Sequence, residues 1–363
     1  MKILYLINYA GKAGSEKYVR ELAEISRQKG ASVFFAYNIH GPLAEHFVQQ
    51  KIPTFQINMR NPLDVKAARA LAKICREHKI DIVHAQYARE NYIAILAKKF
   101  GSGAQVVFTA HFHIKNNFLW RCANKIFIRA NSAVIAVCTS VKNLLVQNGV
   151  SAGKIHVIVN GVTPVENPRP VPPLPFTFVV VGRLSPEKGL MFLLASVKLL
   201  AKYKDSDFKV LIAGDGEQQQ QMQQYIVENG LCDYVEMMGF CTDIPAVLRR
   251  GHVYISSSQS EALSFSVLEA MAESLPVIAT NVGGFPDIVN DKTNCGILVE
   301  YGNEQALSTA MQTFMNDAKL YKTFSQNAIR NIEATFNIQT MADKTFNIYT
   351  QAMTDTNTKY MKS

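Results

Sequence analysis

The stretch that indicates the fold is FTFVVVGRLSPEKG, residues 176–189. Its apolar, β-branched part predicts a strand from Phe176 to Val181 that is buried on both faces and ends at Gly182. A Ser185-Pro186 turn and Lys188 then stand at the head of a predicted helix. A buried strand followed at once by a helix is the repeating unit of a parallel sheet covered by helices. The stretch therefore predicts an α/β fold.

The same alternation of short apolar runs and longer amphipathic segments continues in both directions. In the first half, the predicted strands are Lys2–Ile7, Ser32–Tyr37, Thr54–Ile57, Ile82–His84, Gln105–Thr109, Ala133–Val137 and His156–Val159. In the second half, they are Phe176–Val181, Phe208–Ala213, Tyr234–Met237, Val253–Ile255, Pro276–Ala279 and Ile297–Val299. Segments such as Ser15–Lys29, Leu63–His78 and Glu90–Phe100 predict helices. We expect two doubly wound, Rossmann-like sheets with ligands beyond the carboxyl ends of their strands.

The two predicted sheets are separated by TPVENPRPVPPLP, residues 163–175, which holds six of the 13 prolines. Because proline fixes φ and removes a hydrogen-bond donor, this stretch predicts a linker. We expect an N-terminal domain at 1–165, a linker at 166–175 and a C-terminal domain at 176–340, facing each other across a cleft. The helix expected at 341–363 is amphipathic, and packing back on the N-terminal domain is one option for it.

Composition and charge narrow the class of protein. The chain has 363 residues, of which 48% are apolar, enough for two ordinary cores and too apolar for intrinsic disorder. Residues 1–165 contain 22 Lys and Arg against 8 Asp and Glu, a balance of +14, whereas residues 166–363 contain 16 against 21, a balance of −5. The basic half predicts an anionic partner, which the charge alone leaves open between a membrane surface, a nucleic acid and a phosphorylated substrate.

Neither a membrane span nor export is expected. No apolar run approaches the roughly 20 residues that a spanning helix needs, and the N-terminal apolar run is too short for a signal peptide. The six cysteines lie far apart without a CxxC pair, which is typical of buried thiols in a reducing compartment. We therefore expect a cytoplasmic protein.

The most informative constellation is SSQSEALSFSVLEAMAESLPVIATNVGGFPDIV, residues 257–289. Glu261 is predicted in a polar loop, and Glu269 in a helix that opens near Ser264–Ser266. A helix N-terminus favours a phosphate or another anion, and a carboxylate one turn further in can accept hydrogen bonds from vicinal hydroxyls. The alternative is structural, because Ser266-x-x-Glu269 also fits a capping box and Glu261 alone fits a solvated loop charge.

Two cations, Arg183 and Lys188, follow the strand Phe176–Val181 and are predicted at the carboxyl edge of the second sheet. At 4 Å and an effective dielectric constant near 20, each would contribute up to roughly 4 kcal/mol of gross Coulomb attraction to a diphosphate. A solvated helix start is the alternative.

Glycine turns follow three other predicted strands, at Gly11–Gly14, Gly214–Gly216 and Gly283-Gly284. Glycine lets the backbone approach a ligand closely, but none of these turns fits GxGxxG or a Walker loop. Each one alone is more typical of a tight connection. Their shared place at strand ends favours ligand binding.

Histidine and aspartate supply two weaker candidates. His111 follows the strand Gln105–Thr109 and would donate a hydrogen bond to a sugar hydroxyl or shuttle a proton, unless it is structural like many single histidines. His111 and His113 form a weak candidate metal pair, without a nearby acidic ligand. Asp205-Ser206-Asp207 resembles a metal-holding DxD, but it precedes a strand and is predicted at the wrong edge of the sheet.

Together, GRLSPEKG, the Glu261-x7-Glu269 pair with AMAESLPVIATNVGGFPDIV after it, and the doubled sheet resemble the retaining glycosyltransferases of family 4, which have the GT-B architecture. The resemblance covers nearly the whole chain and is most specific from Val179 to Ile288. Two departures, Ala262 in place of glycine and Gly14-Ser15 in place of a double glycine, bear on the choice of donor.

The resemblance implies a role for each matching residue. Glu269 would hold the ribose of a nucleotide sugar, and Arg183 and Lys188 would clamp its diphosphate. His111 would touch the transferred sugar. The catalytic candidates are His111, Glu261, Arg183 and Lys188. The donor-binding candidates are Gly14, Arg183, Lys188, Gly214, Gly239, Glu261, Ala262, Leu263, Ser264, Phe265, Ser266 and Glu269.

The resemblance also implies the reaction. A hexose or N-acetylhexosamine would move from a nucleotide diphosphate sugar, with UDP as the first choice and GDP as the second, to a lipid-linked, lipopolysaccharide or capsule glycan. Fixed cations and helix N–H groups would stabilise the leaving diphosphate, so no metal and no cofactor are expected. A donor phosphate oxygen would take the acceptor's proton on the same face.

The acceptor side suggests a membrane partner. The segment of residues 111–129 reads HFHIKNNFLWRCANKIFIR and contains Lys115, Arg121, Lys125 and Arg129 among apolar residues. This pattern predicts a basic amphipathic face, which fits the anionic cytoplasmic face of the inner membrane. A core helix with solvated cations is the alternative.

Other functions stay open at this point. A nucleotide-sugar epimerase or phosphorolytic enzyme of similar fold would need no acceptor or would need free phosphate. A basic nucleic-acid-binding module is the non-enzymatic alternative, but nucleic acid is not expected, because the chain has neither a recognised RNA-binding motif nor a basic domain with stacking aromatic residues.

Overall fold

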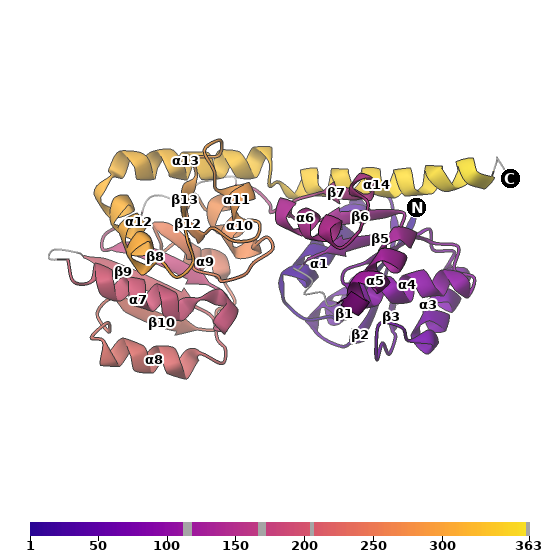
Figure 1. Cartoon of the computed structure of the whole chain (residues 1–363), viewed down its shortest axis with the longest axis horizontal. Helices are drawn as coiled ribbons and strands as arrows, with labels where there is room; N and C mark the ends of the chain where they lie inside the picture. The colour runs from indigo at the N-terminus through magenta and orange to yellow at the C-terminus, as the bar shows by residue number, and fades with distance from the viewer. Residues whose placement is uncertain (112–117, 166–171, 204–206, 361–363) are drawn as a thin grey trace. The chain divides into compact units, whose positions relative to one another are not determined.

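The computed structural model describes residues 1–111, 118–165, 172–203 and 207–360, and the side chains of 118–121 and 355–360 lie outside that description. The chain divides into two compact units (Figure 1). Unit 1 contains Met1–Asn160 and Ile338–Ser363, and unit 2 contains Gly161–Asn337. Each unit holds one parallel sheet between helices, so the predicted α/β fold with two Rossmann-like sheets is confirmed.

The sheet of unit 1 has seven strands in the order β3-β2-β1-β4-β5-β6-β7. Their bounds are β1 Lys2–Tyr9, β2 Ser32–Ile39, β3 Thr54–Gln56, β4 Ile82–Ala85, β5 Gln105–Ala110, β6 Ala133–Ala136 and β7 Ile155–Val157. Ile3 to Ile7 of β1 are fully buried, because helices cover both faces of this central strand. Each large apolar side chain buried in this way contributes about 1.5–3 kcal/mol to folding.

In the described part of unit 1, seven α-helices connect and cover these strands. They are α1 Gly14–Gln28, α2 Pro42–Gln49, α3 Val65–His78, α4 Ala88–Lys99, α5 Phe118–Phe127, α6 Thr139–Gln147 and α14 Ile338–Tyr360. The helices α3 and α4 cover the face that carries Leu4 and Leu6, whereas α1 and α2 cover the face of Tyr5 and Phe35.

The C-terminal helix α14 belongs to unit 1, where it packs against α1 and β5. Its Tyr349 is fully buried, and the hydroxyl lies 2.6 Å from Nδ1 of His84 on β4. Nε2 of His84 lies 2.7 Å from the Thr109 hydroxyl on β5. On the surface, Lys29 Nζ and an oxygen of Asp343 are 2.5 Å apart. These contacts fix the last helix on the first sheet.

The sheet of unit 2 has six strands in the order β10-β9-β8-β11-β12-β13. Their bounds are β8 Phe176–Val181, β9 Phe208–Ala213, β10 Val235–Gly239, β11 Val253–Ser256, β12 Val277–Thr280 and β13 Gly296–Val299. Its helices are α7 Leu190–Leu200, α8 Gln219–Glu228, α9 Ile244–Leu248, α10 Phe265–Ala272, α11 Phe285–Ile288, α12 Glu304–Asn316 and α13 Ala318–Ala334. The main core of the unit lies between the sheet and α7, α8 and α12.

The limits of the units differ slightly from the expected domain limits. The first part of unit 1 ends at Asn160, whereas the sequence predicts a boundary at residue 165. The helix α14 begins at Ile338, whereas the sequence predicts the last segment from residue 341. Within the described residues, no helix is both long and apolar enough to cross a membrane.

Strand order identifies where each sheet can bind a ligand. The direction of winding reverses between β1 and β4 in unit 1 and between β8 and β11 in unit 2. At such a switch point the loops diverge on either side and leave a crevice beyond the carboxyl ends of the strands. The loops after β8 and β11 carry Arg183, Lys188 and Glu261, and the loops after β1 and β4 carry Gly14 and Tyr87.

Candidate functional site

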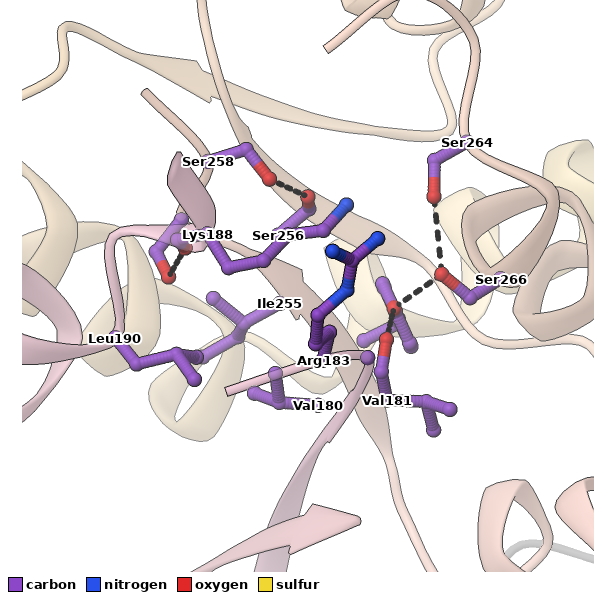
Figure 2. Close-up of a pocket in the computed structure, with 13 residues that line it drawn as sticks. Val180, Val181, Arg183, Lys188, Leu190, Ile255, Ser256, Ser258, Ser264 and Ser266 are labelled. Atoms are coloured by element: carbon purple, nitrogen blue, oxygen red, sulfur yellow. Dashed lines mark hydrogen bonds between the residues drawn. The ribbon is translucent and has the colours of Figure 1, made fainter. Parts of the chain in front are cut away.

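A pocket lies at the switch point of unit 2 (Figure 2). It has an empty volume of about 300 Å³ and is open to solvent. The loop after β8 supplies Arg183 and Lys188, the end of β11 supplies Ser256 to Ser258, and the start of α10 supplies Ser264 and Ser266. Two cations and a helix N-terminus therefore line one pocket.

The two cations have different surroundings. Lys188 Nζ donates to Oε2 of Glu261 at 2.5 Å, and both side chains are partly buried. The Ser257 hydroxyl donates to the carbonyl of Lys188 at 3.0 Å and fixes this turn against the end of β11. Arg183 is exposed and forms no ion pair with any residue that the structure describes. Arg183 is thus the cation available to an anionic ligand.

The N-terminus of α10 is held beside Arg183 by hydroxyl groups. Ser264 is the N-cap of the helix, and its Oγ lies 2.9 Å from Oγ of Ser266. The buried Tyr254 hydroxyl lies 2.9 Å from the same Ser266 oxygen and 3.0 Å from the carbonyl of Val181, so it links α10 to the end of β8. Burial raises the pKa of Tyr254, so the phenol stays protonated and can donate.

The capping box considered as the alternative for Glu269 is not formed. Because α10 begins at Phe265 after the N-cap Ser264, the third helical position is Val267 and Glu269 lies further into the helix. Ala262, Leu263 and Phe265 are buried, whereas Glu269 remains partly exposed. Glu269 thus reaches the surface of α10 one turn beyond the pocket.

Glycines bring the neighbouring loops into close contact. A Cβ on Gly214 would lie 1.8 Å from the carbonyl oxygen of Gly182, and one on Gly283 would lie 1.6 Å from that of Glu261. Both glycines have positive φ, +149° and +60°. Gly214 N–H donates to the carbonyl of Gly239 at 2.8 Å, so the loops after β8, β9 and β10 form one continuous rim. Only glycine allows this spacing at Gly214 and Gly283.

The candidates of unit 1 gather at its own switch point. His111 follows β5 and is buried, and its Nε2 lies 2.9 Å from Oε1 of Gln86, which follows β4. The Tyr18 ring packs edge-on against the His111 ring at a centroid distance of 5.0 Å. Burial lowers the pKa of His111 to about 3, so the imidazole is neutral at physiological pH.

Gly14 is the first residue of α1, at the carboxyl end of β1. Next to it, the Tyr87 hydroxyl donates to Ser15 Oγ at 2.5 Å, and Ser15 donates to Oε2 of Glu16 at 2.6 Å. Glu90 at the start of α4 is buried, and burial raises its pKa to about 7. From the sequence, no role is predicted for Glu16, Tyr87 or Glu90. The contact of Tyr87 with Ser15 spans 72 positions and has no local signal.

Three expectations fall partly outside the described residues. Asp205 and Ser206 of the DxD lie there, while Asp207 immediately precedes β9 at the amino end of that strand. His113 also lies there, as do Lys115 and the side chain of Arg121 on the basic amphipathic face. The described part of that face contains exposed Lys125 and Arg129 and the side chain of Ile126, which is 70% exposed.

Comparison with known proteins adds sequence relatives and a structural neighbour. The model of the glycosyl transferases group 1 matches residues 166–331, and the model of Glycosyltransferase Family 4 matches residues 13–166. The chain is 25% identical to the UDP-Gal:alpha-D-GlcNAc-diphosphoundecaprenol alpha-1,3-galactosyltransferase of Escherichia coli, over 85% of this chain and 86% of the relative.

A second relative, from Campylobacter jejuni, is named N-acetylgalactosamine-N,N'-diacetylbacillosaminyl-diphospho-undecaprenol 4-alpha-N-acetylgalactosaminyltransferase. It is 27% identical over 90% of this chain and 93% of its own. The crystal structure of Anabaena HepE in complex with UDP superposes with a TM-score of 0.81 at 20% identity, over 96% of this chain and 99% of HepE. The likeness to HepE is one of fold.

Proposed function

The chain belongs to the family 4 glycosyltransferases, enzymes of GT-B architecture, and on this premise we propose that it transfers a hexose or N-acetylhexosamine from a UDP-sugar to a lipid-linked or lipopolysaccharide-type glycan. The observation that carries the proposal is the pocket at the switch point of unit 2, where Arg183 and the N-terminus of α10 face one space. A site of this kind suits a diphosphate.

The chemistry of transfer explains why cations are needed there. When the bond between the anomeric carbon and the diphosphate breaks, positive charge develops on the sugar and negative charge on the leaving group. Donors fixed in advance stabilise that charge without reorganising, and removing one such donor typically costs a factor of about 10²–10³ in rate. Arg183 and the N–H groups of α10 would receive the charge of the leaving diphosphate.

Lys188 and Glu261 act as a pair in this proposal. Their ion pair holds the Lys188 ammonium at the pocket and keeps the Glu261 carboxylate beside the turn that precedes α10. Glu261 would face the sugar ring and Lys188 the diphosphate, with Glu269 on the ribose. Gly214 and Gly239 would line the side of the nucleoside, where their lack of side chains leaves the backbone accessible.

The residues of unit 1 would serve the acceptor and the sugar. His111 is neutral because of its burial, and its Nε2–H donates to Oε1 of Gln86, so its Nδ1 would accept a hydrogen bond from a hydroxyl of the transferred sugar. Gly14 would approach the donor phosphate and the acceptor. We propose retention of configuration by attack on the same face, in which a phosphate oxygen of the donor takes the proton of the acceptor hydroxyl. The C–O bond to phosphate breaks as the new glycosidic bond forms, and no metal takes part.

The names of the two sequence relatives support the choice of acceptor, since both contain a diphosphoundecaprenol carrier. The UDP complex of HepE supports the choice of nucleotide. We therefore choose UDP-galactose and α-D-GlcNAc-diphosphoundecaprenol as the first substrates to test.

The test is transfer of radiolabelled galactose to that lipid by the full chain. We expect a labelled lipid product, loss of at least about 99% of its formation in Arg183→Ala, and little change in Arg250→Ala, an exposed arginine paired with Glu236 elsewhere in unit 2. Activity should persist in EDTA, and NMR of the product should show an α linkage. Donor turnover without acceptor, a requirement for free phosphate or loss of activity in EDTA would contradict the proposal.

We also propose that unit 1 contacts an anionic membrane surface. Lys125, Arg129 and the exposed Ile126 support this location on unit 1, and well-placed cations contribute about 1 kcal/mol each near such a surface. Sedimentation with vesicles of 30% anionic lipid, against vesicles of neutral lipid, tests the proposal. Equal binding to anionic and to neutral vesicles would contradict the proposal. Unchanged binding by the double variant Lys125→Glu, Arg129→Glu would also contradict it.

A further inference from the structure

Tyr9 at the carboxyl end of β1 presents an exposed aromatic ring that the site described above does not use. It pairs in register with Ile39, the last residue of β2, so the two side chains lie next to each other on the same face of the sheet. Tyr9 is 48% exposed and Ile39 51%, whereas Ile7 and Tyr37, two residues earlier on the same face, are buried. The ends of two central strands therefore expose a small apolar surface, the Tyr9–Ile39 platform.

The position of the Tyr9 ring is fixed by two glycines. A Cβ on Gly11 would lie 2.4 Å from Cε1 of Tyr9. One on Gly41 would lie 2.4 Å from the carbonyl oxygen of Ala10 and 3.3 Å from Cε2, on the opposite edge of the ring. Gly41 is extended, with φ of 179°, and Gly11 is not in the left-handed region. The backbone conformation at Gly11 does not require glycine. We therefore attribute the glycine to the space that the Tyr9 ring occupies.

The backbone around the platform is also held in place. Ala10 N–H donates to the carbonyl of Ile39 at 3.0 Å, and the carbonyl of Ala10 accepts from the Leu43 N–H at 3.0 Å. Such anchoring keeps the ring in place and lowers the entropy lost when a ligand packs on it. The Tyr9 hydroxyl makes no hydrogen bond to any residue of the described chain, so it is available to a ligand.

The surroundings of the platform indicate the chemistry of its occupant. Lys12 is exposed three residues after Tyr9 and supplies a polar group near the apolar centre. His40 directly follows Ile39, but its two ring nitrogens lie against Tyr37 and Glu45. Two side chains form far less surface than the several hundred Å² typical of a patch that docks on a membrane or a protein. A sugar ring matches these dimensions, with C–H groups on its face and hydroxyls on its rim.

From this arrangement we propose that the Tyr9–Ile39 platform is the subsite for the sugar of the acceptor that receives the transferred residue. The Tyr9 ring packs against the C–H face of that sugar, and the Tyr9 hydroxyl and Lys12 bind its hydroxyls. The same loop leads from Tyr9 to Gly14 at the start of α1, so the acceptor sugar lies within one loop of the proposed donor contact. This inference rests on the proposed function and adds the acceptor subsite to it.

The kinetic test uses UDP-galactose and α-D-GlcNAc-diphosphoundecaprenol. Tyr9→Ala should raise the acceptor KM about tenfold, the loss expected for an aromatic contact, while kcat and the donor KM stay within twofold. Tyr9→Phe should stay within threefold of the wild type. Tyr203→Ala is the matched control, because this tyrosine is 45% exposed in unit 2. An unchanged acceptor KM in Tyr9→Ala overturns the proposal.

The variant Gly11→Ala tests whether the space at Gly11 holds the Tyr9 ring in position. Its new methyl group should displace the ring and raise the acceptor KM severalfold in the wild-type background, with no further effect once Tyr9→Ala is present. Equal effects in both backgrounds would mean that Gly11 acts without the ring, and they would contradict the platform as described.

A binding measurement separates this inference from the proposed function. Saturation-transfer NMR with methyl N-acetyl-α-D-glucosaminide should give signals on the C–H protons with wild type and Tyr9→Phe, and none with Tyr9→Ala. If the wild type gives no signal, the proposed acceptor subsite is wrong. It is also wrong if weaker vesicle binding is the sole effect of Tyr9→Ala. A protein that binds the glycoside through Tyr9 but neither binds UDP nor transfers galactose would instead overturn the proposed function.

Discussion

The two switch points of the molecule are built on the same strand order but present opposite chemistry. In unit 2 the pocket is lined by a cation, Arg183, with the N-terminus of α10 beside it and a Lys188–Glu261 ion pair. In unit 1 the corresponding edge holds a neutral imidazole, His111, and a chain of hydroxyl groups that runs from Tyr87 through Ser15 to the Glu16 carboxyl group. One edge is suited to developing negative charge, and the other to neutral hydroxyls.

This difference teaches that the fold supplies the location and the loops supply the function. Both units leave a crevice where the winding reverses. The charge balance of the two halves does not follow this pattern. Residues 1–165 have a balance of +14, yet no cation is among the groups described at their switch point, His111, Tyr87 and Ser15. Net charge therefore describes the surface of unit 1 and says little about the side chains that meet at its strand ends.

The largest effect should come from removing the charge that distinguishes unit 2. Arg183→Ala should lower kcat/KM for transfer at least about 100-fold and abolish the thermal shift produced by UDP, which is about 2.7 kcal/mol of stabilisation at 100 times the dissociation constant. His111→Asn removes a neutral hydrogen-bonding group, and it should lower kcat/KM by less than about tenfold. Melting curves with UDP and initial rates measure both. A larger loss of kcat/KM in His111→Asn than in Arg183→Ala would contradict the proposed difference between the two switch points.

The next effect concerns acid stability, which should be a property of unit 1. Burial lowers the pKa of His84 and His111 to about 3, against about 6.5 in an unfolded chain. Between these values each of the two histidines is protonated in the unfolded state and neutral in the folded state, so its contribution to stability falls as pH decreases from 6.5 toward 3. The raised pKa of Glu90 opposes the slope of one histidine above about pH 4.5. Each histidine adds about 1.4 kcal/mol per pH unit to this slope.

Urea unfolding between pH 7.5 and 4, followed by hydrogen exchange on peptides of each unit, measures that slope. His84→Gln should reduce the slope for unit 1 by about 1.4 kcal/mol per pH unit and leave that of unit 2 unchanged. An unaltered slope would mean that His84 is charged in the folded protein, next to the Tyr349 and Thr109 hydroxyls.

Much of the fold can be predicted from the sequence, and the reasons are local. The strands β8 and β9 have the predicted bounds, Phe176–Val181 and Phe208–Ala213, because both are apolar runs, each with one polar residue at its second position, and glycine directly follows them. The strand β10 extends to Gly239, two residues past its predicted end, since this glycine continues the pairing with Ala213 at a positive φ. Apolarity predicts a strand, whereas its last residues depend on the neighbouring strand.

The site is predicted less completely, because its contacts cross long stretches of chain. Local motifs identify Arg183, Lys188 and Glu261 as charged groups at strand ends, yet the ion pair of Lys188 with Glu261 spans 73 positions and has no local signal. The link between His84 and Tyr349 spans 265 positions. A motif predicts which edge a residue lies on, and the three-dimensional packing selects its partner.

A double-mutant cycle on that ion pair should give the third effect. Lys188→Met and Glu261→Gln should each cost about 1–2 kcal/mol of stability, because each leaves a partly buried charge without its partner, and the double variant should cost less than their sum. Activity should fall in all three variants. Additive losses of stability would show that the two charges do not depend on each other, and unit 2 would then offer two separate cations.

The smallest effect compares one tyrosine hydroxyl from each switch point. Tyr87→Phe removes the donor to Ser15, and Tyr254→Phe removes the hydroxyl between Val181 and Ser266. Each variant should lose about 1 kcal/mol of stability in urea unfolding, the usual net contribution of a buried hydrogen bond. Only Tyr254→Phe should also raise the donor KM, by about threefold, because its hydroxyl holds the N-terminus of α10 against β8. If Tyr87→Phe raises the donor KM equally, the hydroxyl chain of unit 1 contributes to donor binding, and the division between a charged edge and a neutral edge fails.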